Sequence, residues 1–146
     1  MDQTRRANVV WSGNLQTGSG TITDVTSGSF GNLPVSWPAR TESPNGKTSP
    51  EELLAAAHAA CFSMSLSARL AKNGTPPERL EVSATVTFAQ QEVGWKVAAS
   101  TIAVVGTVPG IDLDTFRSLA DGAKDGCPIS GALKGNVELS VDARLA

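Results

Sequence analysis

Residues 49–67 read SPEELLAAAHAACFSMSLS, and this stretch decides how the rest of the chain is organised. The Ser-Pro-Glu-Glu opening offers an N-cap serine, a proline suited to the first helical position and a glutamate spaced to complete a capping box. Gly74 and the two prolines that follow it stop a helix. We therefore predict one long helix over about residues 50–72.

The first half of this helix, residues 53–61, is uncharged and has apolar or small side chains on every face. A helix with that pattern is expected to be enclosed on all sides, at the centre of the fold. The uncharged run over residues 53–68 is too short and too polar to span a bilayer, so no membrane contact is predicted.

Strands are predicted on both sides of the helix. Short β-type patches separated by glycine and asparagine predict a meander over about residues 7–37, followed by a loop at 40–48. The part from 80 to 146 is expected to hold a hairpin, a second helix capped by Asp112, a short helical turn after Pro128 and a last strand. The order predicts a single α+β domain over residues 1–146, with antiparallel strands packed around the long helix.

The composition of the chain argues against several classes of function. The chain has 146 residues, of which 40% are hydrophobic and 18% charged, as in an ordinary globular protein. The net charge of −2 and the scattered basic residues argue against a nucleic-acid partner. No signal peptide is recognised at the N-terminus, and two cysteines without one predict a reducing, cytoplasmic location.

The two cysteines lie in contrasting contexts. Cys61 ends an apolar run within the helix, where a free cysteine usually acts as a small buried hydrophobe. Cys127 lies between Gly126 and Pro128, so it can cap a short helix whose dipole favours its anion. Local chemistry therefore makes Cys127 the more acidic thiol, and leaves open whether the pair packs the core or forms a redox dithiol.

The single histidine, His58, precedes Cys61 by three positions and shares its helical face. That spacing suits metal ligands, and it also admits a cysteine–histidine hydrolase. We favour a packed, hydrogen-bonded core histidine, because the chain has no Cys-x-x-Cys pair and no evident group to orient a catalytic histidine. No metal and no cofactor are predicted.

Three motifs together resemble the OsmC family, the osmotically inducible and organic hydroperoxide resistance proteins. They are the helix sequence at 49–67, VPGIDLDTF at 108–116 with AKDGCPIS at 123–130, and the opening VVWSGNLQTGSGTI at 9–22. The resemblance covers nearly the whole chain and is closer to the osmotically inducible branch.

The resemblance implies a thiol-dependent peroxidase that reduces organic hydroperoxides, and hydrogen peroxide less well. In the family's pattern Cys61 attacks the peroxide and becomes a sulfenic acid, and Cys127 resolves it to a disulfide. Arg40 stabilises the thiolate and the departing alkoxide, and Glu51, ten positions before Cys61, orients Arg40.

The resemblance also implies an intertwined homodimer and an external dithiol reductant, for which a lipoyl-bearing protein is suggested and glutathione or thioredoxin are alternatives. Two other functions stay open at this point. One is a non-enzymatic thiol protein or ligand-binding protein of the same fold, and the other is a zinc-binding module.

Overall fold

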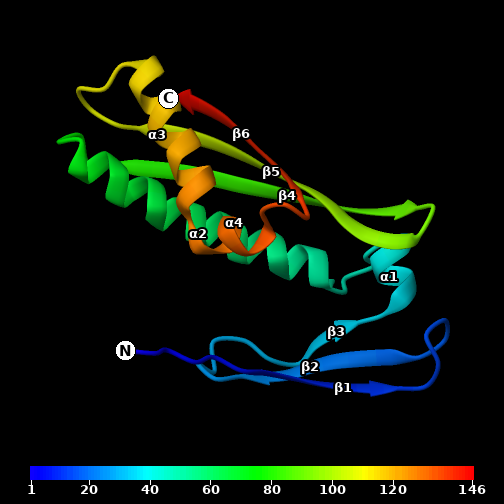
Figure 1. Cartoon of the computed structure of the whole chain (residues 1–146). Helices are drawn as coiled ribbons and strands as arrows, with labels where there is room; N and C mark the ends of the chain where they lie inside the picture. Colours follow the sequence, from blue (N-terminus) through cyan, green and yellow to red (C-terminus); the bar gives the residue numbers. More distant parts are fainter. The chain divides into compact units, whose positions relative to one another are not determined.

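The computed structural model describes all 146 residues, which form two compact units, Met1–Leu53 and Leu54–Ala146. The mixed α+β class predicted from the sequence is confirmed (Figure 1). In chain order the elements are β1 (Ala7–Ser12), β2 (Ser19–Val25), β3 (Leu33–Val35), α1 (Trp37–Thr41), α2 (Pro50–Lys72), β4 (Arg79–Gln91), β5 (Gly94–Thr107), α3 (Leu113–Gly126), α4 (Pro128–Leu133) and β6 (Glu138–Leu145). One domain over residues 1–146 stays a prediction.

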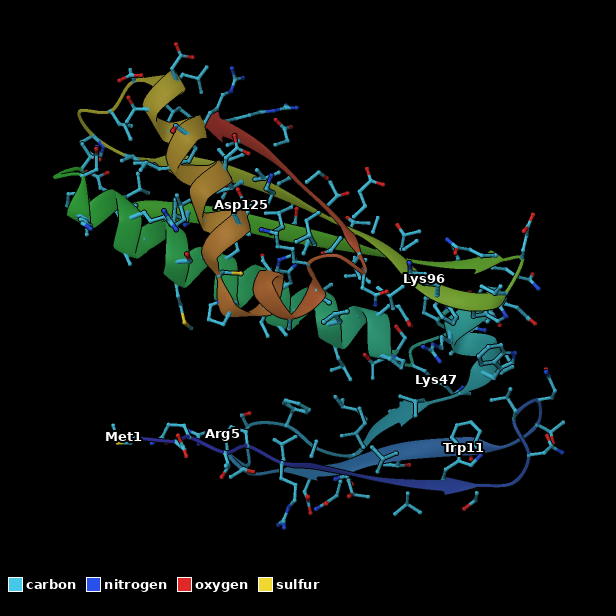
Figure 2. The ribbon with its side chains drawn as sticks, viewed as in Figure 1. Met1, Arg5, Trp11, Lys47, Lys96 and Asp125 are labelled. Carbon is cyan, nitrogen blue, oxygen red and sulfur yellow. The ribbon has the colours of Figure 1, made fainter.

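The first unit contains a three-stranded antiparallel sheet in the order β1-β2-β3. Trp11 on β1 lies opposite Gly20 on β2, and Figure 2 labels the Trp11 side chain. A Cβ at Gly20 would come within 2.7 Å of Cε3 of the indole, so only glycine lets the ring lie over this strand.

Helix α1 differs from the sequence prediction, which continued the strand to residue 37 and placed a loop at 40–48. Ser36 caps the helix, because its hydroxyl accepts a hydrogen bond from the Ala39 N–H at 3.2 Å. Pro38 occupies the first turn, where its missing N–H costs nothing. A capping serine and a proline in the first turn, which together predict the long helix, therefore also start this short one.

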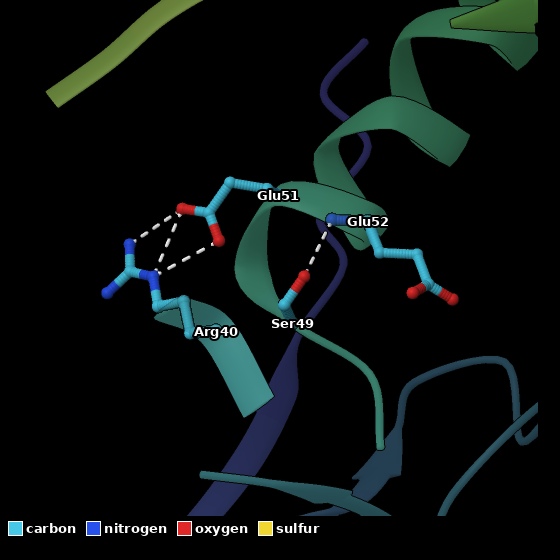
Figure 3. Close-up of polar contacts among 4 residues, drawn as sticks. All are labelled: Arg40, Ser49, Glu51 and Glu52. Atoms are coloured by element: carbon cyan, nitrogen blue, oxygen red, sulfur yellow. Dashed lines mark hydrogen bonds and ion pairs between the residues drawn. The ribbon is translucent and has the colours of Figure 1, made fainter. Parts of the chain in front are cut away.

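Helix α2 begins and ends where the sequence predicts. The Ser49 hydroxyl accepts a hydrogen bond from the Glu52 N–H at 3.1 Å (Figure 3). The Glu52 carboxylate points away from Ser49 in the same view, so the cap consists of the serine half of the predicted capping box.

The second unit contains a sheet in the order β4-β5-β6. Strands β4 and β5 form the predicted hairpin, with Gln91 paired to Gly94. Strand β6 is an exception to the antiparallel strands that we expected, because it pairs with β5 in parallel. Helices α3 and α4 lie between β5 and β6 in the chain and supply the long crossover that a parallel pair requires.

The core lies on one face of this sheet. Helices α2 and α3 both contribute to it, and on β5 the buried side chains alternate with exposed ones, so both helices cover the same sheet face. The fully buried members are Phe62, Leu66, Leu70, Ile102, Val104, Phe116, Ala120 and Ala123.

The opposite face of α2 is exposed in the single chain, where we expected enclosure on all sides. Met64 is 73% exposed, and five alanines of the helix are exposed with it. By length and composition alone α2 also passes the test for a membrane-spanning helix. Its sheet-facing side chains instead form the core of the second unit, as in the core helix of a soluble protein.

Candidate active site

The structure brings the two cysteines together. Cys61 is partly buried on α2, and Cys127 is 1% exposed at the junction of α3 and α4. Both are free thiols, and Cys127 lies close enough to Cys61 to affect the pKa of its thiol. Cys127 caps α4, as the sequence predicts, because its sulfur accepts a hydrogen bond from the Ser130 N–H at 3.4 Å.

The surroundings of Cys61 within the second unit favour the neutral thiol. Burial raises the pKa of Cys61 above its ordinary value, and the adjacent Cys127 raises it further. The Ile129 backbone N–H lowers the same pKa but does not cancel the rise. A nucleophilic Cys61 therefore requires a cation from outside this cluster.

His58 is fully buried and hydrogen-bonded at both ring nitrogens. Nδ1 lies 2.7 Å from the Ser100 hydroxyl on β5, and Nε2 lies 2.8 Å from the Ser130 hydroxyl on α4. Burial lowers the pKa of His58, so the imidazole is neutral at neutral pH. This is the packed core histidine that the sequence analysis favoured.

The Ser130 hydroxyl makes a second contact. It lies 3.0 Å from the Cys127 sulfur, so one serine touches both the imidazole and a thiol. Sequence analysis identified neither Ser100 nor Ser130. A signal for Ser100 exists, because it shares a strand face with the apolar Ile102 and Val104, and a polar side chain on a buried face needs a partner.

Arg40 and Glu51 form an ion pair within the first unit (Figure 3). The Arg40 Nη2 donates to Oε1 of Glu51 at 2.8 Å, and Nε donates to both carboxylate oxygens at 3.1 Å. The Glu51 side chain is only 9% exposed and that of Arg40 is 29% exposed, which holds the guanidinium in a defined orientation. The Arg40 Cζ also lies 5.9 Å from the centre of the Trp37 ring.

Beside this ion pair the first unit has an apolar hollow of about 200 Å³. Arg40 contributes the charged side chain of its wall. The other lining residues are Trp11, Leu15, Val35, Ser36, Trp37 and Pro50. A hollow of this composition suits an uncharged hydrocarbon group next to a polar one.

The chain offers no cluster of three or more histidine, cysteine, aspartate or glutamate side chains arranged for a metal ion. The two nitrogens of His58 are already occupied by serine hydroxyls. The i, i+3 spacing of His58 and Cys61 therefore serves two different contacts: the histidine bonds to serines, and the cysteine meets another thiol.

Comparison with known proteins shows the family to which the chain belongs. Residues 43–142 match the family model described as OsmC-like protein. The chain is 36% identical over 135 residues to the peroxiredoxin OsmC of Escherichia coli (strain K12), covering 92% of this chain and 93% of that protein. It is 30% identical over 95 residues to an organic hydroperoxide resistance protein of Xanthomonas axonopodis pv. citri, covering 64% and 65%.

A solved structure gives the same result. The fold matches the organic hydroperoxide resistance protein OhrB of Bacillus subtilis with a TM-score of 0.75 at 26% identity, over 95% of this chain and 98% of that one. The resemblance recognised in the three sequence motifs is confirmed. The chain belongs to the OsmC family.

Proposed function

We propose that this protein is a thiol-dependent peroxidase that reduces organic hydroperoxides through Cys61 and Cys127. The single observation that carries the proposal is the closeness of the two thiols, which come from separate parts of the chain and lie near enough for Cys127 to raise the pKa of Cys61. Relatives named as a peroxiredoxin and as organic hydroperoxide resistance proteins support the same reaction class.

In the first step the Cys61 thiolate attacks the outer oxygen of the hydroperoxide. A sulfur–oxygen bond forms, the O–O bond breaks, and the alkoxide takes up a proton to leave as an alcohol. Cys127 then attacks the Cys61 sulfenic acid, which forms the disulfide and releases water. An external dithiol restores both thiols by exchange. A dihydrolipoyl group on a carrier protein is the reductant that we propose, in a reducing compartment such as the cytoplasm.

Arg40 is proposed to supply the cation that Cys61 lacks. Its guanidinium would favour the Cys61 thiolate and the departing alkoxide, and Glu51 would hold it in place. The defined, largely buried ion pair supports this role, because a solvated loop arginine would have no such partner. Arg40 and Cys61 belong to different units, so their meeting is part of the proposal.

An alkyl or lipid hydroperoxide is the proposed substrate. The apolar hollow whose wall includes Arg40 would take the hydrocarbon group, while the guanidinium meets the peroxide oxygens. Hydrogen peroxide has no hydrocarbon group to occupy this hollow and would lose the free energy of its burial, about 25 cal/mol per Å² of apolar surface.

The active form is proposed to be a homodimer. Exposed apolar residues on α2 recur every three or four positions along one helical face, which is the spacing of a helix–helix contact. They are Ala57, Ala60, Met64, Ala68 and Ala71. In the first unit every residue of β1 is exposed, including Val9 at 57% and Val10 at 59%. A second copy would cover both surfaces.

The direct test is peroxide consumption. Purified protein is mixed with dihydrolipoamide and either cumene hydroperoxide or hydrogen peroxide, and peroxide loss is followed. We expect turnover that is faster with cumene hydroperoxide and absent in Cys61→Ser. Equal consumption by the wild type and Cys61→Ser would reject the enzyme and favour a non-enzymatic thiol protein.

A further inference from the structure

Four buried side chains form a continuous line of polar contacts. One of them is Cys127, and the other three have no role in the proposed peroxidase steps. The line runs from Ser100 to His58 at 2.7 Å, from His58 to Ser130 at 2.8 Å, and from Ser130 to Cys127 at 3.0 Å. All four residues are 1% exposed or less. This line joins β5, α2 and α4, and it ends on Cys127, the thiol proposed to attack the Cys61 sulfenic acid.

The hydrogen-bonding capacity of each group fits a proton path. A neutral imidazole has one donor and one acceptor nitrogen. With Nδ1–H donating to Ser100, Nε2 accepts from the Ser130 hydroxyl, and the Ser130 oxygen is left to accept from the Cys127 thiol. Each of the three contacts then has one donor and one acceptor. The Cys127 thiol donates to Ser130, and the Ser130 hydroxyl donates to His58.

We propose that His58, acting through the hydroxyl of Ser130, removes the proton of Cys127 while Cys127 attacks the sulfenic acid of Cys61. This inference rests on the proposed peroxidase function. Ser130 touches the reacting sulfur and is the catalytic residue of the pair, whereas His58 acts through it.

The thiol proton of Cys127 moves to Ser130 as the hydroxyl proton of Ser130 moves to Nε2 of His58. The Cys127 sulfur bonds to the Cys61 sulfur, the sulfenic S–O bond breaks, and hydroxide leaves. Cys127 is oxidised and the sulfenic sulfur is reduced. Hydroxide then takes the proton held by His58, which gives one water and restores the neutral imidazole.

Burial explains why a relay is needed. Cys127 has almost no contact with solvent, so water does not readily collect its proton. After the transfer, the Ser130 O–H and N–H both point at the Cys127 thiolate and stabilise it. Along this line the Cys127 thiol is reached through Ser130, and the Cys61 thiol and the Arg69 guanidinium, which packs against Gly126, lie beyond it. Burial lowers the pKa of His58, so the imidazole is neutral and one ring nitrogen can accept a hydrogen bond.

The test separates the two chemical steps in a single turnover. The full-length protein receives one equivalent of cumene hydroperoxide, and sulfenic acid on Cys61 and the disulfide are quantified over time by chemical trapping and mass spectrometry. In Ser130→Ala we expect sulfenic acid to form at the wild-type rate and the disulfide to form about 100-fold more slowly at pH 7, the usual scale of lost general base catalysis.

Two matched comparisons accompany it. Ser63→Ala removes a serine on α2 that bonds only its own helix, to the Ala59 carbonyl, and is expected to keep the wild-type resolution rate. Ser130→Thr and Ser130→Val have the same shape and differ in the hydroxyl, so only Thr should restore resolution. This second pair gives an answer even where Ser130→Ala fails to fold.

The pH profile distinguishes a relay from a packing role. Without the Ser130 hydroxyl, a base in solution must take the Cys127 proton, so the resolution rate of Ser130→Val should rise more steeply with pH than the wild-type rate. Wild-type resolution in Ser130→Val, or slow resolution in both Thr and Val variants with an unchanged profile, overturns the relay and leaves the peroxidase intact. Failure of the wild type to form any sulfenic acid overturns both.

Discussion

Nε2 of His58 lies 2.8 Å from the hydroxyl of Ser130, a residue 72 positions further along the chain. This contact fixes the start of α4, whose capping residue is Cys127, against the long helix that holds Cys61. The position of the two thiols is therefore set by a buried hydrogen bond that involves neither of them.

The buried histidine makes stability depend on pH. The pKa of His58 in the folded protein is lowered from its ordinary 6.5, so below pH 6.5 the unfolded chain binds a proton that the folded chain does not. The free energy of unfolding should fall as pH decreases from 6.5 toward 5, with a slope of at most about 1.4 kcal/mol per pH unit. Urea denaturation at a series of pH values measures it.

His58→Gln is the control for that slope, because glutamine keeps a polar side chain in the cavity and does not titrate. Its free energy of unfolding should be lower overall but should change less between pH 6.5 and 5. The Asp112 carboxylate does not interfere, because its lowered pKa affects stability only below its ordinary value of 3.8. If the free energy of unfolding changes with pH equally in the wild type and in His58→Gln, the pH dependence does not come from His58.

The ion pair of Arg40 with Glu51 should matter for the first chemical step. Arg40→Lys keeps the charge but cannot form the two-nitrogen contact with the carboxylate, and Glu51→Gln removes the charge that orients the guanidinium. Both should lower the rate of Cys61 oxidation by cumene hydroperoxide at least about tenfold, the low end of what a lost charge-stabilising donor costs.

The matched control is Arg144→Lys, which alters an arginine–carboxylate pair with Asp142 whose side chains are 71% and 54% exposed. Surface pairs contribute little, so its oxidation rate should equal that of the wild type. An Arg40→Lys variant with the wild-type rate, and with an unchanged pKa of Cys61 in alkylation kinetics, would remove Arg40 from the mechanism.

Close packing of β5 against α3 predicts a steep cost at Gly106. A Cβ there would lie 2.6 Å from Cζ of the fully buried Phe116. Gly106→Ala should lower the free energy of unfolding by about 1–3 kcal/mol, as overpacking does. Gly131→Ala in α4 meets no atom within 4 Å and should raise it by up to about 1 kcal/mol, because alanine favours a helix. Thermal or urea denaturation measures both changes in the free energy of unfolding. Equal changes in the two variants would contradict the close contact between Gly106 and Phe116.

The exposed face of α2 should control association. Met64, which is 73% exposed in the single chain, lies in the apolar row assigned to the dimer. Met64→Glu should place a charge in that interface and shift the protein toward monomer in sedimentation experiments. Lys72→Glu, an exposed residue at the end of the same helix, should leave the dimer intact. A wild-type protein that is monomeric at all concentrations contradicts the proposal.

Much of the fold is predictable because its signals are local. Ser49, Pro50 and Gly74 fix the ends of α2, and Asp112 fixes the start of α3, where its carboxylate accepts from the Thr115 N–H at 2.8 Å. Helix α1 escaped prediction because it has only five residues and directly follows a β-type run. The parallel direction of β6 escaped it because strand direction depends on the crossover and leaves no mark in the strand's own residues.

The site divides in the same way. The two cysteines stand out in the sequence by themselves, but their roles and those of Arg40 and Glu51 come from the family resemblance, since the distance between Cys61 and Cys127 in sequence gives no physical reason for them to meet. Ser100 and Ser130 are 42 and 72 positions from His58, and nothing near the histidine in sequence points to them. The exposed half of α2 could not be foreseen either, because an alanine-rich helix looks the same whether its own chain or another covers it.

The reaction of the two thiols with one equivalent of cumene hydroperoxide tests the central claim most directly. Free thiols are titrated and the digested protein is mapped by mass spectrometry, with Cys127→Ser alongside. We predict that both thiols disappear together, that a Cys61–Cys127 disulfide is recovered, and that Cys127→Ser instead accumulates sulfenic acid on Cys61. Two thiols that survive the peroxide, or a sulfenic acid found first on Cys127, would contradict the account.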